Sequence, residues 1–357
     1  MPSLRRIGAL AVVLVGASFW LLAPSSTEKE ETLLFERRII GVADLHGDYD
    51  HALAVLRNTG VIAPDSTKWI AGKDILVSTG DTVDRGDDTI KLYTLYQSLR
   101  EQSVKAGGQV INLLGNHEMM NALHDWRYVT NGDIDSFGGK ARRRRAMSID
   151  GWLGKEWLDF YNVTANVALL PNAARGIVDD WVTSSSITFV HGGITPHWAN
   201  IGTDTINELG HSLLLKALSS PSEEYDLPNN ITKPELALWS SDGPFWYRGY
   251  ATDDETTACA LVQQALHGLG SYRMVMGHTP HFSGIRRRCK DDQILVIDTG
   301  ISKAYGGTQS AIVMKSALSS VAYGKGNAWV VEHNTTAHYV GRSQQPLQRY
   351  RQMHVLS

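Results

Sequence analysis

Five short motifs of this 357-residue chain place a carboxylate, an amide or an imidazole beside glycine. They are Asp44-Leu45-His46-Gly47, Gly80-Asp81-Thr82-Val83-Asp84-Arg85-Gly86, Gly115-Asn116-His117-Glu118, Val190-His191-Gly192-Gly193 and Gly277-His278-Thr279-Pro280. Carboxylate oxygens and imidazole nitrogens bind divalent cations, and a carboxylate can bridge two of them. Two cations held roughly 3.5–4 Å apart clamp both the attacking and the leaving oxygen of a phosphoryl displacement. The motifs therefore predict a two-metal hydrolytic site whose candidate ligands are Asp44, His46, Asp81, Asn116, His191 and His278.

Each motif has an ordinary structural explanation when it is taken alone. The motif around Asp81 could be a capped helix start, and that around Asn116 a polar helix N-terminus. His191 and His278 could each be a core or turn histidine. Because all five motifs follow an apolar run and share flanking glycines, the metal site is the better interpretation.

The apolar runs indicate how such distant side chains meet. Strands are expected at 38–43, 74–78, 109–114, 187–190 and 273–276, and helices at about 49–57 and 89–105. Alternating strands and helices are typical of a parallel sheet, where ligands bind beyond the carboxyl ends of the strands. Further strand-like runs at 294–298, 311–314 and 328–332 are expected to complete a second sheet. The expected fold is a four-layer α/β/β/α sandwich of two mixed sheets with flanking helices.

The motifs resemble those of the calcineurin-like metallophosphoesterases, and within them the phosphoprotein phosphatases, over about residues 39–314. Only Ala43 departs from the pattern, since the family usually has glycine there. Asp298-Thr299-Gly300-Ile301-Ser302 differs from the Ser-Ala-Pro-Asn-Tyr stretch of the eukaryotic serine/threonine members. The segment 243–250 and the turn after Gly277 resemble the bacterial-type Shewanella-like phosphatases.

The resemblance implies two divalent metals, manganese, iron or zinc, held by the six candidate ligands. Asp81 would bridge the two ions. The other ligands would be divided as Asp44 and His46 in the first site, and Asn116, His191 and His278 in the second.

The resemblance also implies roles in catalysis. His117 matches the general acid, and Asp84 would orient and polarise it. Arg85 and Arg248 would bind the phosphoryl oxygens through their guanidinium groups. A metal-bridging hydroxide would attack phosphorus directly, and His117 would protonate the leaving oxygen. The expected function is a phosphoprotein phosphatase acting on phosphoserine, phosphothreonine or phosphotyrosine monoesters.

Two other functions are considered. A phosphodiesterase or a dinucleoside polyphosphate hydrolase could use the same metal core. A non-catalytic binding protein is disfavoured because no ligand position is lost. The net charge of −3 argues against a nucleic-acid partner.

The N-terminus predicts a membrane segment. A basic flank (1–6) precedes 17 uncharged residues (7–23), and a polar linker (24–36) follows. The uncharged stretch exceeds the usual core of a signal peptide, about 7–15 residues, and just suffices to span a bilayer. Since no small-x-small cleavage site follows, a signal anchor is favoured over a cleaved signal peptide, with an organelle transit sequence as the alternative. The catalytic domain would then be lumenal or extracellular.

The remainder of the chain is expected to be one catalytic domain (37–340) with a helical cap insertion at about 119–185 and a mobile tail (341–357). The arginine run 142–145 could attract an anionic substrate, but a solvated surface run is favoured. The aromatic cluster at 239–250 could be a substrate wall or core. Cys259 and Cys289 could pair in an oxidising compartment or be two separate buried thiols.

Overall fold

The computed structural model describes residues 31–174, 185–323 and 326–355. The expected membrane segment at 7–23 lies outside this range. Within the described residues, no helix has both the length and the apolar character needed to cross a bilayer.

The described strands form two mixed sheets. The seven-stranded sheet has the order β12 (Gln345–Val355), β11 (Gly326–Tyr339), β10 (Ser310–Tyr323), β1 (Glu31–Val42), β2 (Ile75–Ser78), β3 (Gln109–Leu113) and β4 (Tyr161–Asn162). The five-stranded sheet has the order β5 (Thr164–Ala168), β6 (Ser186–Val190), β7 (Ser271–Met276), β9 (Ile294–Val296) and β8 (Arg286–Arg288). Strands β1 to β4 are parallel to one another, as are β6, β7 and β9, so the carboxyl ends of each set lie at one edge.

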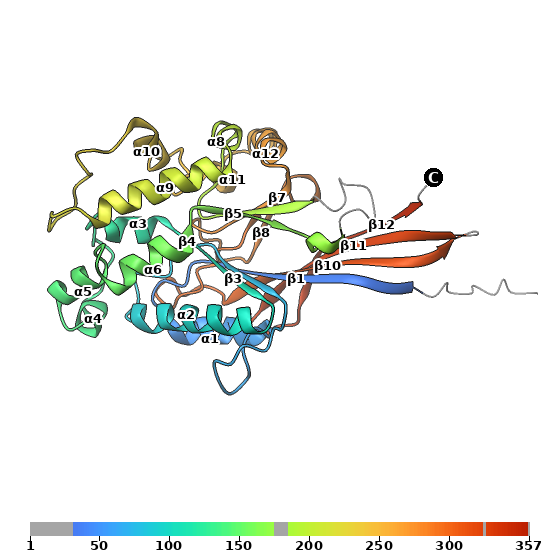
Figure 1. Cartoon of the computed structure of the whole chain (residues 1–357), viewed down its shortest axis with the longest axis horizontal. Helices are drawn as coiled ribbons and strands as arrows, with labels where there is room; N and C mark the ends of the chain where they lie inside the picture. Colours follow the sequence, from blue (N-terminus) through green and yellow to red (C-terminus); the bar gives the residue numbers. More distant parts are fainter. Residues whose placement is uncertain (1–30, 175–184, 324–325, 356–357) are drawn as a thin grey trace, which may run out of the picture.

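Helices cover the outer faces of both sheets, as Figure 1 shows. Helices α1 (Tyr49–Asn58) and α2 (Thr89–Lys105) lie beside the first sheet, and α8 (Pro196–Ile201), α9 (Thr203–Leu218) and α12 (Glu255–Leu269) lie beside the second. Between the sheets, Ile40, Phe189 and Ile312 belong to one buried apolar cluster. The expected four-layer fold is confirmed.

The other helices lie in the connections. They are α3 (Asn116–Ala122), α4 (Asn131–Ser136), α5 (Lys140–Ala146), α6 (Trp152–Phe160), α10 (Lys233–Leu238), α11 (Gly249–Thr252) and the 3₁₀ turns η1 (Asn172–Ala174) and η2 (Lys290–Asp292). The insertion expected to be a helical cap at 119–185 also contains β4 and β5, which each extend one of the sheets. Among the described residues of this insertion, the helical part consists of the end of α3, of α4, α5 and α6, and of the short η1 turn.

Two expectations about the ends of the catalytic domain are wrong. β1 begins at Glu31, inside the expected linker 24–36, and pairs there with β10. The expected tail 341–357 contains β12, which pairs with β11. The strands β10 and β11, expected to complete the second sheet, belong to the first. In Figure 1 the strands β1, β10, β11 and β12 project beyond the helices. The first half of β1 is exposed, which explains why its sequence resembles a linker.

The buried carboxylate of Glu235, which closes a capping box at the start of α10, gives a stability prediction. It accepts hydrogen bonds from Lys216 Nζ at 2.6 and 2.7 Å and from Ser212 Oγ at 2.6 Å. Burial raises the pKa of Glu235, but these hydrogen bonds outweigh burial and lower the pKa to about 2. Because the folded pKa lies below the model-peptide value, the carboxylate stabilises the fold above about pH 4.5, and this stabilisation is lost as the pH falls toward about 2.

Glu235→Gln is therefore expected to lower the free energy of unfolding by about 2 kcal/mol at pH 7. Urea denaturation at pH 7 and at acidic pH would measure the free energy of unfolding of both proteins. The difference between the variant and the wild type should become smaller below about pH 4.5. Glu208→Gln, at an exposed position of α9, is the matched control and should change little. A Glu235→Gln deficit that is the same at both pH values would contradict the assignment.

Candidate metal centre

The six candidate ligands lie at the carboxyl ends of β1, β2, β3, β6 and β7. Asp44 and His46 follow β1, Asp81 follows β2, and Asn116 begins α3 just after β3. The last two ligands, His191 and His278, follow β6 and β7. All six side chains are buried, with at most 4% of their surface exposed. The structure thus brings together every candidate ligand named from the sequence.

Asp81 lies at the centre of the group. Its Oδ2 is 3.6 Å from His46 Nε2 and 3.3 Å from His191 Nε2, so one carboxylate faces a histidine from each sheet. His191 Nε2 is also 2.8 Å from Asn116 Oδ1 and 3.1 Å from His278 Nδ1. A single carboxylate between two clusters of nitrogen and oxygen atoms has the arrangement of a bridging ligand.

Backbone carbonyls fix the orientation of two histidine rings. His46 Nδ1 donates to Val83 O at 3.1 Å, and His191 Nδ1 donates to Thr79 O at 2.9 Å. In a neutral ring the lone pair is then on Nε2, and in both residues Nε2 faces Asp81. Such a hydrogen bond on the far nitrogen is the usual support of a metal-binding histidine.

Unpartnered polar atoms show that the residues fit a metal. Asp44 Oδ1 and His278 Nε2 are buried and have no hydrogen-bond partner within the described residues. Buried polar atoms without a partner are rare in folded proteins and call for an explanation such as a bound ion. Two glycines also leave room for the carboxylates of Asp81 and Asp44. A Cβ atom on Gly115 would overlap Asp81 Oδ1, and one on Gly277 would overlap Asp44 Oδ1. Both glycines are therefore needed for the close approach of these carboxylates.

Backbone strain is concentrated at the same place. Nine described residues other than glycine have a positive φ, and five of them are expected site residues. These five are His46 (43°), Asp81 (52°), Asp84 (70°), Arg85 (62°) and His278 (67°). Each such conformation costs on the order of 1–3 kcal/mol, and it persists where the surrounding structure imposes it.

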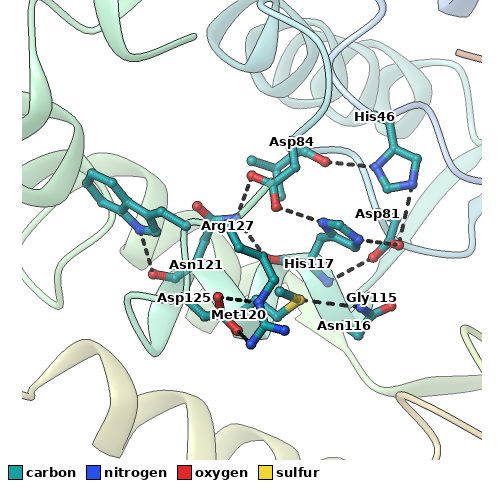
Figure 2. Close-up of polar contacts among 12 residues, drawn as sticks. His46, Asp81, Asp84, Gly115, Asn116, His117, Met120, Asn121, Asp125 and Arg127 are labelled. Atoms are coloured by element: carbon teal, nitrogen blue, oxygen red, sulfur yellow. Dashed lines mark hydrogen bonds and ion pairs between the residues drawn. The ribbon is translucent and has the colours of Figure 1, made fainter. Parts of the chain in front are cut away.

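His117 lies beside the ligand cluster and pairs with Asp84 (Figure 2). Its Nδ1 donates to Asp84 Oδ2 at 2.7 Å, so its Nε2 faces the centre, 3.8 Å from Asp81 Oδ2. Burial lowers the pKa of His117, but the carboxylates of Asp81 and Asp84 outweigh burial and raise it. The ring is therefore placed to carry a proton to a group bound at the centre.

The two candidate phosphate-binding arginines flank the site in different ways. The Arg85 guanidinium lies 4.2 Å from the ring centre of Tyr128 and 5.0 Å from that of Tyr305. Arg248 is exposed, and its Nη1 donates to His278 O at 2.7 Å and to Thr279 Oγ1 at 3.0 Å. These hydrogen bonds connect Arg248 to the candidate ligand His278, although the sequence around Arg248 matches the family motif less closely than the other motifs do.

The structure adds Glu118, which sequence reasoning left without a role. The carboxylate of Glu118 accepts from the backbone N–H groups of Asp81 (2.9 Å), Thr82 (2.8 Å) and Gly115 (2.7 Å). It also accepts from Tyr93 Oη at 2.9 Å. Glu118 therefore joins the loops after β2 and β3 that carry Asp81 and Asn116. Its place in the Gly-Asn-His-Glu motif was the available signal.

Asp298 is a second residue that was not expected at the site. It follows β9, a sixth strand end at the same edge, and is 3% exposed. Burial and then the charge of Asp81 raise the pKa of Asp298 to about 6, although the Gly300 N–H donates to it at 2.9 Å. An acidic residue after an apolar run and before glycine was the signal for Asp298, as it was for Asp44.

The structure also shows the state of the two cysteines, of the aromatic cluster at 239–250 and of the arginine run. Cys259 and Cys289 form a disulfide. Phe245 and Tyr250 are core residues, whereas Trp239 and Trp246 line a cavity of about 550 Å³ together with Tyr128, Tyr225 and Arg248. The arginine run 142–145 is not a simple surface run, because Arg143 is completely buried.

Comparisons with known proteins agree with this geometry. Residues 37–295 match the calcineurin-like phosphoesterase family model. An uncharacterized protein of Schizosaccharomyces pombe is 38% identical over 79% of each chain. Shewanella-like protein phosphatase 2 of Arabidopsis thaliana is 27% identical over 78% of this chain and 76% of its own.

Solved structures show the same fold. The cold-active protein-tyrosine phosphatase of a psychrophilic Shewanella species has a TM-score of 0.65 and 22% identity, over 87% of this chain and 80% of its own. The family expected from the motifs is confirmed: the chain belongs to the calcineurin-like phosphoesterases.

Proposed function

We propose that this protein is a two-metal phosphoprotein phosphatase that hydrolyses phosphomonoesters of serine, threonine or tyrosine. The observation that carries the proposal is the convergence of strand ends from both sheets on the Asp81 carboxylate, next to the His117–Asp84 pair. The relatives named Shewanella-like protein phosphatase support it.

The donor set fits manganese, iron or zinc, since imidazole nitrogens and carboxylate oxygens suit all three. Asp44 and His46 would hold one ion, Asp81 would lie between the two, and the other site would use Asn116, His191 and His278. When bound, the ions would lower the pKa of a water molecule and offset negative charge on the phosphoryl oxygens.

The remaining side chains would bind the substrate and move a proton. Arg85, which contacts the rings of Tyr128 and Tyr305, and Arg248, which is held by a backbone carbonyl, would each offer a guanidinium to the phosphoryl oxygens. A monoester dianion gains more from two guanidinium groups than a diester monoanion does. His117 Nε2 would donate its proton to the leaving alkoxide or phenoxide, while Asp84 holds the ring through Nδ1.

The test is the phosphatase activity of the full-length chain after chelation and after separate addition of Mn²⁺, Fe²⁺ or Zn²⁺. Chelation should abolish turnover of aryl phosphate and of phosphoserine, phosphothreonine or phosphotyrosine peptides, and at least one metal should restore it. A bis-aryl phosphate should be a much poorer substrate. A clear diester preference would support a phosphodiesterase or dinucleoside polyphosphate hydrolase instead, and metal binding without any turnover would indicate a binding protein.

We further propose that residues 7–23 associate with a membrane and that the catalytic domain is lumenal or extracellular. The Cys259–Cys289 disulfide supports this location, because disulfides persist in oxidising compartments. In sealed microsomes, whose interior corresponds to the lumenal and extracellular side, the catalytic domain should resist added protease until detergent is present. Digestion without detergent would contradict the proposal.

A further inference from the structure

Arg143 on α5 is a buried cation within a run of four arginines. Its Nε donates to Asp133 Oδ2 at 2.8 Å, and its Nη1 donates to Asn121 Oδ1 at 2.7 Å. Its Nη2 lies 3.6 Å from Asp84 Oδ1. The guanidinium also lies 4.6 Å from the ring centre of Trp126. A completely desolvated arginine with this many partners is unlike the solvated residues beside it in the run.

Asn121 links Arg143 to the general-acid pair. The Asn121 amide nitrogen donates to Asp84 Oδ1 and to His117 O, both at 2.9 Å, and Figure 2 shows Asp84 between His117 and Asn121. A guanidinium can only donate hydrogen bonds, so its partner on Asn121 must be the amide oxygen. This contact fixes the amide with its nitrogen toward Asp84. Without Arg143 the amide could rotate and present its oxygen to the carboxylate.

Arg143 is also placed to compensate the charges of two buried carboxylates. Asp84 and Asp133 are both completely buried, and Arg143 forms an ion pair with each of them. Burying a carboxylate without a cation is strongly destabilising. Among the described residues, the cationic partners of Asp84 are Arg143 and His117. Arg143 therefore offsets the charge of the Asp84 carboxylate and holds this carboxylate in place beside His117.

We propose that Arg143 is a positioning residue for leaving-group protonation, acting on His117 through Asn121 and Asp84. The inference rests on the proposed phosphomonoesterase function and deepens it, because it joins an inserted helix to the chemistry. Nothing places Arg143 in contact with the substrate, so its effect is on orientation and not on binding.

Positioning predicts a kinetic signature that a purely structural role lacks. A leaving group that is stable as an anion needs little help from a general acid, whereas a poor leaving group needs much. Misplacing His117 should therefore slow hydrolysis of phenyl phosphate far more than hydrolysis of 2,4-dinitrophenyl phosphate. The Michaelis constants should change little, since the arginines that would bind phosphate are untouched.

The experiment compares Arg143→Met, Arg143→Lys and Asn121→Ala with the wild type in the full-length, metal-loaded chain. Arg143→Met is expected to lower kcat for phenyl phosphate by roughly 10–100-fold and that for 2,4-dinitrophenyl phosphate by less than about threefold. Arg143→Lys should restore part of the loss because it keeps the charge. Asn121→Ala keeps the ion pairs of Arg143 with Asp133 and Asp84 but removes the hydrogen bond that Asn121 donates to Asp84, so it should show the same kind of selective loss. Metal content and circular dichroism should match the wild type.

Arg145→Met is the matched control, since Arg145 is exposed on the same helix. It should leave both rates unchanged. Equal losses for the two substrates, or no loss, in Arg143→Lys and Asn121→Ala would overturn the inference, whatever the folding of Arg143→Met. A wild type that hydrolyses neither substrate with any metal would instead overturn the proposed function.

Discussion

Replacing His117 by asparagine is expected to lower kcat for a phosphoserine peptide by roughly 10²–10⁴-fold, the usual contribution of a general acid. His117 Nε2 faces the ligand cluster because Nδ1 is held by Asp84 at 2.7 Å. The variant removes the proton donor but leaves the six candidate ligands in place. Steady-state kinetics, together with metal analysis of the same samples, would measure the effect.

The metal analysis is needed because geometry alone allows a second role. His117, His46 and Asp81 each offer a ligand atom, and these atoms lie within 4.8 Å of one another. If His117→Asn loses metal in step with activity, His117 is a ligand and not the proton donor. His211→Asn, at an exposed position of α9, should leave both kcat and metal content unchanged.

The residues of the candidate site could largely be predicted, because the pattern that marks a strand end lies within a few consecutive residues. An apolar run followed by a polar residue and glycine marks a strand end, and parallel strand ends share one edge. This rule placed Asp44, Asp81 and His191 correctly at the edge of a sheet. The same rule applies to Asp298, which follows β9 and lies two residues before Gly300, although Asp298 is not part of the five motifs.

Other features were not predictable because they depend on distant partners. The exposed half of β1 and the whole of β12 lack a continuous apolar face, so only pairing with β10 and β11 shows that they are strands. Arg143 lies among similar residues and differs only because Asp133 and Asn121 meet it in the folded chain. The spacing of these residues in the sequence does not reveal such a contact.

Several candidate ligands lie on strained loops that are tied to one another. Asp81 and His278 both have positive φ, and the Glu118 carboxylate ties the loop of Asp81 to that of Gly115. Preorganising the loops in this way lowers the reorganisation needed when cations bind. It also means that the local stability of the centre depends on residues that touch no ion.

Asp81→Asn is expected to have the largest effect on metal binding. Burial raises the pKa of Asp81, but His191 and His117 outweigh burial and lower the pKa well below its usual value, so this candidate ligand carries a negative charge. Asparagine has the same shape without the charge, and it can bridge two cations only poorly. The variant should lose at least one metal, and its kcat should fall by at least roughly 10³-fold.

A thermal readout separates loss of metal from loss of the fold. A ligand that binds only the folded state raises its stability by mass action, so added metal should raise the Tm of the wild type. Asp81→Asn should fold but show a much smaller rise. Asp159→Asn, at an exposed position of α6, should behave like the wild type in both assays. Retention of both ions by Asp81→Asn would show that the bridging carboxylate is another residue. Asp298 would then be the first residue to test, because its buried carboxylate lies near those of Asp44 and Asp81.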